Sequence, residues 1–427
     1  MKVAVLGLWH LGSVTAACLA DAGFDVVGID DNADVIRDLN NGQPALFEPG
    51  LGELVVKGIK SRKLDFTTDF AAVTNCDLVW VTYDTPVDDD DVADVAWVIE
   101  RIERLFVHLK ENSVVLISSQ LQAGTTKMVA EEFSQRCSGR KVHFAYSPEN
   151  LRLGQAIKVF TQPGRIIIGT FDAQPRALLE TVLGKFCDTL LWMSVTSAEM
   201  VKHGLNAFLA TCVTFANELA TICELVGANA IDVERGLRSD PRIGRSAYIR
   251  PGGAFAGGTL ARDVSFLNHL ASDRGGKIPL LGAILGSNAE HRVWPFRQIC
   301  SRLKPKDGPV VVLGLSYKPG TDAIRRSSAI ELCRSLLSAN YNVRAVDPVV
   351  RTLPPDLAEQ IEIKSSALDV LQGAAVAVVA TEWPEFLALQ KADISRFMSR
   401  PLIIDPTCFL ARNLDTDGIE YITVGRG

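Results

Sequence analysis

The sequence predicts an α/β protein: two Rossmann-like, doubly wound domains joined by a long central helix and a helical middle domain. Short strand-like runs alternate with helical patterns in the first part of the chain, a mainly helical stretch follows, and a second alternation begins after Lys304–Gly308. Strands that alternate with helices form βαβ units around a parallel sheet. We therefore expect domains at 1–195, 196–303 and 304–427, for which a chain of 427 residues is long enough.

Each expected strand is a short run rich in β-branched and other apolar residues. In the first alternation the runs are Lys2–Leu6, Asp25–Ile29, Asp77–Thr82, Val114–Ser118, His143–Ala145 and Arg165–Gly169. In the second they are Val310–Leu313, Asn342–Val346, Val376–Ala380 and Leu402–Asp405. The long helix is expected over Thr196–Val226, where Thr196 and Glu199 have the spacing of a capping box. A glycine-rich segment, Pro251–Gly258, interrupts the helical middle.

Composition and charge exclude several classes of function. The net charge of −6 and the pI near 5.6 offer nucleic acid no basic surface. The nine cysteines are scattered, without a Cys-x-x-Cys pair, which favours a reducing compartment and argues against disulfides or a metal centre. No run reaches the roughly 20 apolar residues of a membrane span, and the N-terminus is too brief for a signal sequence. We expect a cytoplasmic protein whose partners include neither a membrane nor nucleic acid.

A glycine turn follows the first expected strand and precedes a helical run. Gly7 and Gly12 bracket the turn and Leu11 lies inside it, a context in which the turn holds a pyrophosphate at a helix N-terminus. Asp30 ends the second strand, where a carboxylate accepts hydrogen bonds from an adenosine ribose. Such a carboxylate repels a 2′-phosphate and Asp31 adds to its charge, so the expected cofactor is NAD rather than NADP.

One position departs from the dinucleotide pattern. Trp9 stands where a second glycine should let the backbone approach the pyrophosphate. One interpretation is that Trp9 packs away from the ligand and the turn is wider. The other is that dinucleotide binding is weakened or altered.

Three polar residues follow one stripe of the expected long helix. At about 100° per residue, Asn206 lies about 40° and Asn217 about 60° from Lys202. Amide and amine groups among Leu, Phe and Val neighbours need polar partners, because unpaired buried groups are costly. The stripe is either a structural hydrogen-bond network between domains or a surface facing a substrate, with Lys202 balancing charge on a reacting hydroxyl.

Motifs in the order typical of one enzyme family run nearly end to end. They are Asn40…Gly42…Pro44…Glu48-Pro-Gly-Leu51, Thr85-Pro86 with Asp94, Gly124-Thr-Thr126, Ser147-Pro-Glu-Asn-Leu-Arg-Leu-Gly154, Pro163…Arg165-Ile-Ile-Ile-Gly169, Lys202-x-x-x-Asn206, Asn217-Glu218, Pro241-Arg-Ile-Gly244, Gly314-Leu-Ser-Tyr-Lys-Pro-Gly-Thr-Asp322…Arg325, Asp347-Pro348 and Thr381-Glu-Trp383. With these motifs the sequence resembles the UDP-glucose 6-dehydrogenase/GDP-mannose dehydrogenase family.

The resemblance implies an activity and its partners. Members bind NAD in the N-terminal domain and the nucleotide sugar largely in the C-terminal one. They oxidise a sugar C6 hydroxyl to a carboxylate with two NAD, usually as homodimers built around the long helix. A UDP-hexose is therefore the expected substrate, and a surface polysaccharide or modified glycan the expected pathway.

The resemblance also implies roles for individual residues. Lys202, Asn206 and Asp263 would handle the hydroxyl proton and the oxyanion, and Glu149 would assist a water step. Besides the glycine turn, the residues implied for NAD are Thr85, Pro86 and Arg325. Those implied for the substrate are Asn217, Arg242, Tyr248, Phe255, Gly257 and Lys318, of which Arg242 could reach the site of a partner subunit.

The sequence breaks the family pattern in the glycine-rich segment. Thr259, in Ala254-Phe-Ala-Gly-Gly-Thr-Leu-Ala-Arg-Asp263, stands at the position of the family's nucleophilic cysteine. Further departures are Arg262 for a lysine, Gln120 for a threonine, Asn150 for an aromatic residue, and Ala323 and Arg326 for acids.

The exchange of a thiol for a hydroxyl bears on the reaction class. A thiol titrates near 8.5, so some thiolate exists at neutral pH, whereas a threonine hydroxyl needs a dedicated base. The first hydride transfer needs no cysteine, which predicts a two-electron dehydrogenase. Two alternatives remain open: a four-electron enzyme in which Thr259 only fills space, and a non-catalytic nucleotide-sugar-binding protein. A β-hydroxyacid dehydrogenase shares the first domain and long helix, but the second α/β domain with Lys318 and Asp322 argues against it.

Overall fold

The computed structural model describes residues 1–86, 93–149 and 151–426, and Asn150 lies outside them. The chain forms two compact units, Met1–Leu205 and Asn206–Gly427. The boundary falls within the long helix α8 (Val195–Val226). The finer division at 195 and 303 stays a prediction.

The first unit is built on an eight-stranded sheet in the order β3-β2-β1-β4-β5-β6-β7-β8. Its strands are β1 (Lys2–Leu6), β2 (Asp25–Ile29), β3 (Leu64–Thr67), β4 (Leu78–Val81), β5 (Val114–Ile117), β6 (His143–Tyr146), β7 (Ile166–Thr170) and β8 (Leu190–Met193). All neighbouring strands are parallel except β6 and β7. The register pairs Val3 of β1 with Val26 of β2 and Leu78 of β4, so the glycine turn leaves the sheet at a central strand.

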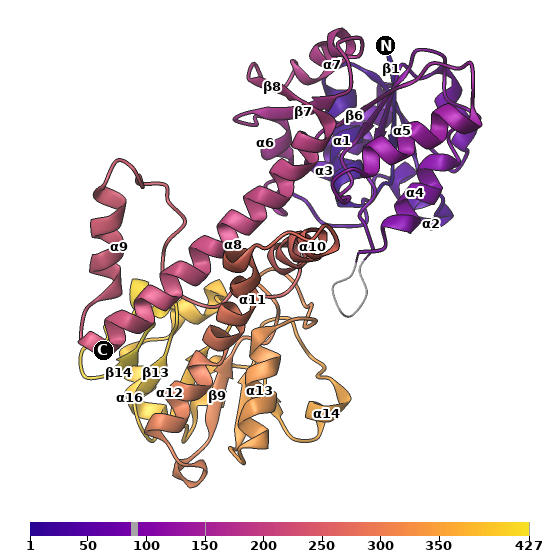
Figure 1. Cartoon of the computed structure of the whole chain (residues 1–427). Helices are drawn as coiled ribbons and strands as arrows, with labels where there is room; N and C mark the ends of the chain where they lie inside the picture. The colour runs from indigo at the N-terminus through magenta and orange to yellow at the C-terminus, as the bar shows by residue number, and fades with distance from the viewer. Residues whose placement is uncertain (87–92, 150, 427) are drawn as a thin grey trace. The chain divides into compact units, whose positions relative to one another are not determined.

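Helices cover both faces of this sheet (Figure 1). Val3 and Val5 belong to one core cluster and Ala4 and Leu6 to the other, because successive side chains of a strand point to opposite faces. The first cluster includes residues of α1 (His10–Asp21), α2 (Ala33–Asn40), α3 (Leu51–Lys60), α6 (Ala156–Thr161) and α7 (Arg176–Leu183). The second includes residues of η1 (Phe70–Asn75), α4 (Val95–Glu103) and α5 (Thr125–Arg136).

The start of α8 differs from the expected capping box. The helix begins at Val195, and the Ser194 hydroxyl accepts from the Ser197 backbone N–H at 3.2 Å. The carboxylate of Glu199 is instead fully buried and accepts from the backbone N–H groups of Gly124 and Thr126, at 2.6 and 3.0 Å. Glu199 therefore caps α5 rather than its own helix, since the first N–H groups of a helix lack partners within it.

The second unit contains a six-stranded parallel sheet in the order β11-β10-β9-β12-β13-β14. Its strands are β9 (Val310–Leu313), β10 (Val343–Val346), β11 (Glu362–Lys364), β12 (Val376–Val379), β13 (Leu402–Ile404) and β14 (Glu420–Ile422). The helices are the rest of α8, α9 (Ala230–Ser239), α10 (Thr259–Asp273), α11 (Pro279–Arg292), α12 (Trp294–Arg302), η2 (Pro305–Asp307), α13 (Ser328–Ser338), α14 (Pro355–Ala358), α15 (Ala367–Leu371), η3 (Pro384–Ala388), α16 (Lys391–Phe397) and η4 (Leu410–Arg412). Val310 and Val312 face one core cluster, and Val311 and Leu313 face the other.

In both units the first strand ends in a glycine turn whose backbone is bound by an acid of the neighbouring strand. Gly7 after β1 has φ +84°, and Gly314 after β9 has φ +89°. An acid at the end of the neighbouring strand accepts from the residue after each glycine, Asp30 from Leu8 N at 2.8 Å and Asp347 from Leu315 N at 2.7 Å. The predicted fold class, with two Rossmann-like doubly wound sheets, is confirmed.

One helix in the part of the chain that the structure describes meets the length and composition criteria of a membrane span. Helix α8 is long and apolar enough to cross a membrane by length and composition, with a mean hydropathy of 1.4 over its most apolar window. This is weak evidence for a membrane, because core helices of soluble proteins meet the same criteria. The helix also buries polar side chains, among them Glu199, Lys202 and Asn206.

Candidate active site

The dinucleotide turn of the first unit requires glycine at both ends. A Cβ at Gly7, whose φ is +84°, would lie 2.4 Å from Cδ1 of Tyr83. A Cβ at Gly12 would lie 1.8 Å from the Gly7 carbonyl oxygen. The chain therefore turns tightly from β1 into α1, which begins at His10. The free N–H groups of that first helical turn can hold an anion.

Trp9 fits the turn without backbone cost. It is the N-cap residue of α1 with φ −72° and ψ −150°. A negative φ is accessible to any residue, so this position does not demand glycine for its conformation. Trp9 is 44% exposed, so its ring is not buried in the core of the first unit. Its effect on NAD affinity stays a prediction.

The remaining residues implied for NAD lie in different settings. The Thr85 hydroxyl is buried and donates to the Gln120 carbonyl oxygen at 2.8 Å, whereas Pro86 is exposed. Leu11 is partly buried in the first turn of α1, and Arg325 is exposed in the second unit. Thr85 thus ties the end of the β4 segment to the segment after β5.

Lys202 and Glu149 form an ion pair within the first unit. The Lys202 ammonium donates to the Glu149 carbonyl oxygen at 2.7 Å and lies 3.2 Å from its carboxylate. Lys202 is buried, while the second carboxylate oxygen of Glu149 accepts from Leu151 N at 2.8 Å. A buried charge needs such a partner, and the pair brings together two residues implied to be catalytic.

Asn206 and Asp263 form a second buried pair, within the second unit. The Asn206 side-chain amide donates to the Asp263 carboxylate, and both residues are almost fully buried. Asp263 belongs to the first turns of α10. The amide fixes one carboxylate oxygen in place, as expected for a group that must hold a set orientation.

The glycine-rich segment is held by side chains from two helices. Asn217 of α8 accepts from Gly252 N at 2.9 Å, and Asn288 of α11 accepts from Phe255 N at 2.9 Å and donates to its carbonyl oxygen at 2.8 Å. His291 of α11 bonds the Gly252 carbonyl oxygen at 2.7 Å, and burial lowers its pKa. Asn217, expected to contact substrate, is therefore occupied by the backbone. The sequence interpretation missed Asn288 and His291, although a spacing of three places them on one helix face.

Thr259 is the first residue of α10 and is exposed. In the part of the chain that the structure describes, no hydrogen bond engages its hydroxyl. The N-cap residue Gly258 has φ +97°, and a Cβ there would lie 3.7 Å from Arg326 Nη1 and 3.9 Å from the Tyr317 hydroxyl. Arg326 and Tyr317 therefore lie beside Gly258, the residue that precedes Thr259.

The other residues implied for the substrate are mostly on the surface of the second unit. Arg242 is highly exposed and pairs with Asp240 at 2.6 Å. Tyr248 and Lys318 are also exposed, and Gly257 and the side chain of Phe255 are partly buried.

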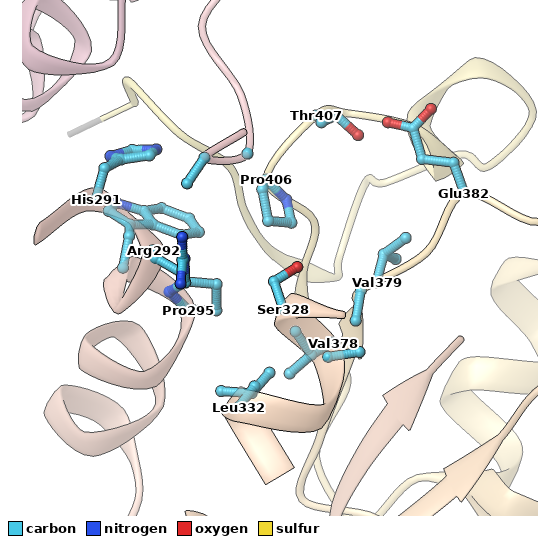
Figure 2. A pocket seen from close by; sticks show the side chains of 15 residues that line it. His291, Arg292, Pro295, Ser328, Leu332, Val378, Val379, Glu382, Pro406 and Thr407 are labelled. Atoms are coloured by element: carbon cyan, nitrogen blue, oxygen red, sulfur yellow. The ribbon is translucent and has the colours of Figure 1, made fainter. Parts of the chain in front are cut away.

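A small cavity of about 90 Å³ lies at the carboxyl ends of β12 and β13 in the second unit. Figure 2 shows His291 and Arg292 on one side, Ser328 at the start of α13 below, and Pro406 and Thr407 above. The carboxyl edge of a parallel sheet is where doubly wound folds bind ligands.

Asp347 does not mirror the expected role of Asp30 at this edge. Its carboxylate accepts from four backbone N–H groups and from the Trp383 indole. Asp30 accepts from two, Leu8 N and Asn32 N. The acid of the second unit is therefore occupied by the protein itself, and only the first unit keeps the arrangement suited to an adenosine ribose.

Comparison with known proteins also assigns different ligands to the N-terminal and C-terminal domains. Models of the UDP-glucose/GDP-mannose dehydrogenase family match the chain as an NAD binding domain over residues 1–187, a central domain over 196–290 and a UDP binding domain over 311–412. UDP-glucose 6-dehydrogenase of Rhizobium meliloti is 31% identical over 436 residues, covering both chains completely. The chain belongs to the UDP-glucose/GDP-mannose dehydrogenase family.

Other family members have the same fold and similar length. UDP-glucose 6-dehydrogenase TuaD of Bacillus subtilis is 30% identical over 430 residues, 100% of this chain and 93% of TuaD. The structure of a UDP-glucose dehydrogenase from Pyrobaculum islandicum superposes with a TM-score of 0.86 at 28% identity, covering 100% of this chain and 98% of the other. This member of the UDP-glucose/GDP-mannose dehydrogenase family is thus an NAD-dependent nucleotide-sugar dehydrogenase with an NAD-binding N-terminal domain and a UDP-binding C-terminal domain.

Proposed function

We propose that the chain removes two electrons from one hydroxyl of a nucleotide sugar, most simply a UDP-hexose, to give an aldehyde or ketone. The single observation that carries this proposal is Thr259, an exposed hydroxyl where the family's pattern places a cysteine. Without a thiolate there is no thiohemiacetal from which a second hydride can leave. The same groups can run the reaction in reverse, as a reductase.

The groups that the first hydride transfer needs are present in this chain. NAD, held at the glycine turn of Gly7 and Gly12, would supply the hydride acceptor, and side chains would handle the hydroxyl proton and the charge on oxygen. The buried Lys202 ammonium, paired with Glu149, is suited to stabilise a developing alkoxide. The Asp263 carboxylate, oriented by Asn206, is suited to accept the proton. These roles are carried over from the resemblance.

Two alternatives predict different products. A four-electron enzyme would oxidise an aldehyde hydrate directly, with Glu149 assisting the water and Thr259 filling space. A non-catalytic binding protein is favoured by Trp9 together with Thr259, and is opposed by the two ion-paired or hydrogen-bonded pairs, Lys202–Glu149 and Asn206–Asp263.

Counting NADH per sugar tests the proposal. With a panel of UDP-sugars and NAD, we expect one NADH per sugar from the natural chain, because Thr259 cannot form a thioester. In Thr259→Cys we expect a second NADH and an acid product, and Thr259→Ser serves as the matched hydroxyl control. Two NADH per sugar from the natural chain would contradict the two-electron reaction.

Ligand-induced thermal stabilisation separates a binding protein from an enzyme. A ligand at 100 times its Kd stabilises the folded state by about 2.7 kcal/mol. A raised melting temperature with both NAD and UDP-sugar is expected here. A response to the sugar but not to NAD would favour the non-catalytic alternative.

We also propose that the chain is a homodimer, through an apolar stripe on the second-unit part of α8. Phe208, Phe215 and Ile222 are exposed and seven residues apart, and Leu225 and Val226 continue the exposed surface. A seven-residue spacing keeps side chains on one helix face. Contiguous exposed apolar side chains on that scale mark interaction surfaces.

Phe215→Asp is expected to shift the dimer to monomer, because a charge would be buried without a partner in the interface. Light scattering after size exclusion measures the change at several protein concentrations. Leu280→Asp, at an exposed leucine on α11, is the control and should leave the mass unchanged. A natural chain that is monomeric at micromolar concentration would overturn the dimer.

A cytoplasmic location without membrane contact stays a prediction.

A further inference from the structure

Asp31, directly after the ribose-binding acid, is paired with two arginines of the first unit. Its Oδ2 lies 3.0 Å from Arg101 Nη2 and 3.4 Å from Arg104 Nη1. The sequence interpretation treated Asp31 as added negative charge against a 2′-phosphate. The structure gives Asp31 a different setting, because its carboxylate is paired with both guanidinium groups, whereas Asp30 accepts from backbone N–H groups.

Both arginines are held in place by aromatic rings. The guanidinium carbon of Arg101 lies 3.4 Å from the centre of the Trp97 ring, and that of Arg104 lies 4.1 Å from the centre of the Phe70 ring. Stacking of this kind orients a guanidinium at little entropic cost. Arg101 is mostly buried, and its Nε has no hydrogen-bond partner among the residues that the structure describes.

Two aromatic rings connect Arg101 to the dinucleotide turn. The Trp97 and Tyr83 rings are packed edge to face, with their centres 5.5 Å apart. Tyr83 in turn lies against Gly7, where it leaves no room for a Cβ. Burial raises the pKa of Tyr83, and the charges of Asp30 and Asp31 raise it further. Arg101 is therefore linked to the turn through Trp97 and Tyr83 and is paired with Asp31, which directly follows Asp30, the acid expected to meet the adenosine ribose.

We infer that Asp31 is a specificity-determining residue that selects NAD by occupying Arg101 and Arg104. A 2′-phosphate is recognised by arginines next to the ribose acid, and these two are already positioned for it. As long as the Asp31 carboxylate is bound to both arginines, their N–H groups on that side are occupied, and a phosphate also meets the charge of Asp30. Without the Asp31 carboxylate, the same edge carries a net charge of +1 and two oriented forks of N–H donors.

Fluorescence titration of the purified chain with NADH and NADPH tests this inference without relying on turnover. In Asp31→Ala we expect the ratio of NADPH to NADH affinity to rise about tenfold or more. Asp34→Ala is the matched control, since Asp34 is an exposed acid three residues away that pairs with Arg37. Adding Arg101→Ala and Arg104→Ala to Asp31→Ala should cancel the gain.

The outcomes separate the inference from a general charge effect. An affinity ratio that changes no more in Asp31→Ala than in Asp34→Ala would overturn it, as would a gain that persists after both arginines are removed. Asp31→Asn keeps the side-chain shape and provides the same comparison if the alanine variant is unstable. Because binding is measured directly, the result does not depend on whether one or two hydrides leave the sugar.

Discussion

Lys202→Met is expected to lower kcat by about 10²–10⁴-fold. The ammonium of Lys202 is buried and held by the Glu149 carbonyl oxygen and carboxylate. Methionine keeps most of the apolar stem but removes the charge that would stabilise an alkoxide, so the loss should fall on kcat. Steady-state kinetics with the active UDP-sugar measures kcat and KM, and NAD titration measures cofactor binding.

The controls for Lys202→Met address charge and folding. Lys57→Met removes an exposed lysine that pairs with Asp21 in the same unit, and it should leave kcat unchanged. An unaltered melting temperature and NAD affinity in Lys202→Met would locate the loss in the chemical step. If kcat stays at the natural value, Lys202 has only a structural role and the proposed proton and charge chemistry is wrong.

Asp347→Ala is expected to destabilise the second unit by about 4–5 kcal/mol, near the largest effects of single substitutions. Asp347 is 2% exposed, and its loss leaves the Leu315 and Ser316 N–H groups of the Gly314 turn and the Val349 and Val350 N–H groups without their acceptor. Each unsatisfied buried donor costs about 1–3 kcal/mol. Urea unfolding followed by tryptophan fluorescence and circular dichroism measures the change. Asp273→Ala, at the exposed end of α10, should change stability by less than about 0.5 kcal/mol.

The same carboxylate predicts how stability depends on acid. Burial by itself raises the pKa of Asp347, but hydrogen bonds from Leu315, Val350, Val349 and Ser316 outweigh it and hold the pKa below its usual value. A lowered pKa contributes stability that is fully present above the unfolded value of about 3.9 and is lost as pH falls through the folded value. Asp347→Asn should therefore show a smaller loss of stability below about pH 4 than the natural chain. Identical acid profiles would contradict this assignment.

The strands that pattern alone predicted are the interior strands of both sheets. The four that the sequence interpretation missed, β3, β8, β11 and β14, are the four edge strands. Interior strands such as β4 and β12 are buried at every position, whereas β8 and β14 have no fully buried residue. An edge strand has only one neighbour and is partly solvated, so it needs no continuous apolar run and leaves a weak pattern.

The sequence by itself determined which chemical groups this enzyme has: the glycine turn with Asp30, the polar residues of α8, and a hydroxyl at position 259. Their local setting follows from strand and helix periodicity, which operates over a few residues. Only the tertiary structure decided which groups contact one another. The contacting residues are far apart in the sequence: 53 positions for Lys202 and Glu149, 57 for Asn206 and Asp263, and 73 for Asp31 and Arg104. Contacts at such separation depend on how whole elements pack. Because of them, Asp31 pairs with arginines, Asn217 binds the backbone of the glycine-rich segment, and Glu199 caps α5 rather than its own helix.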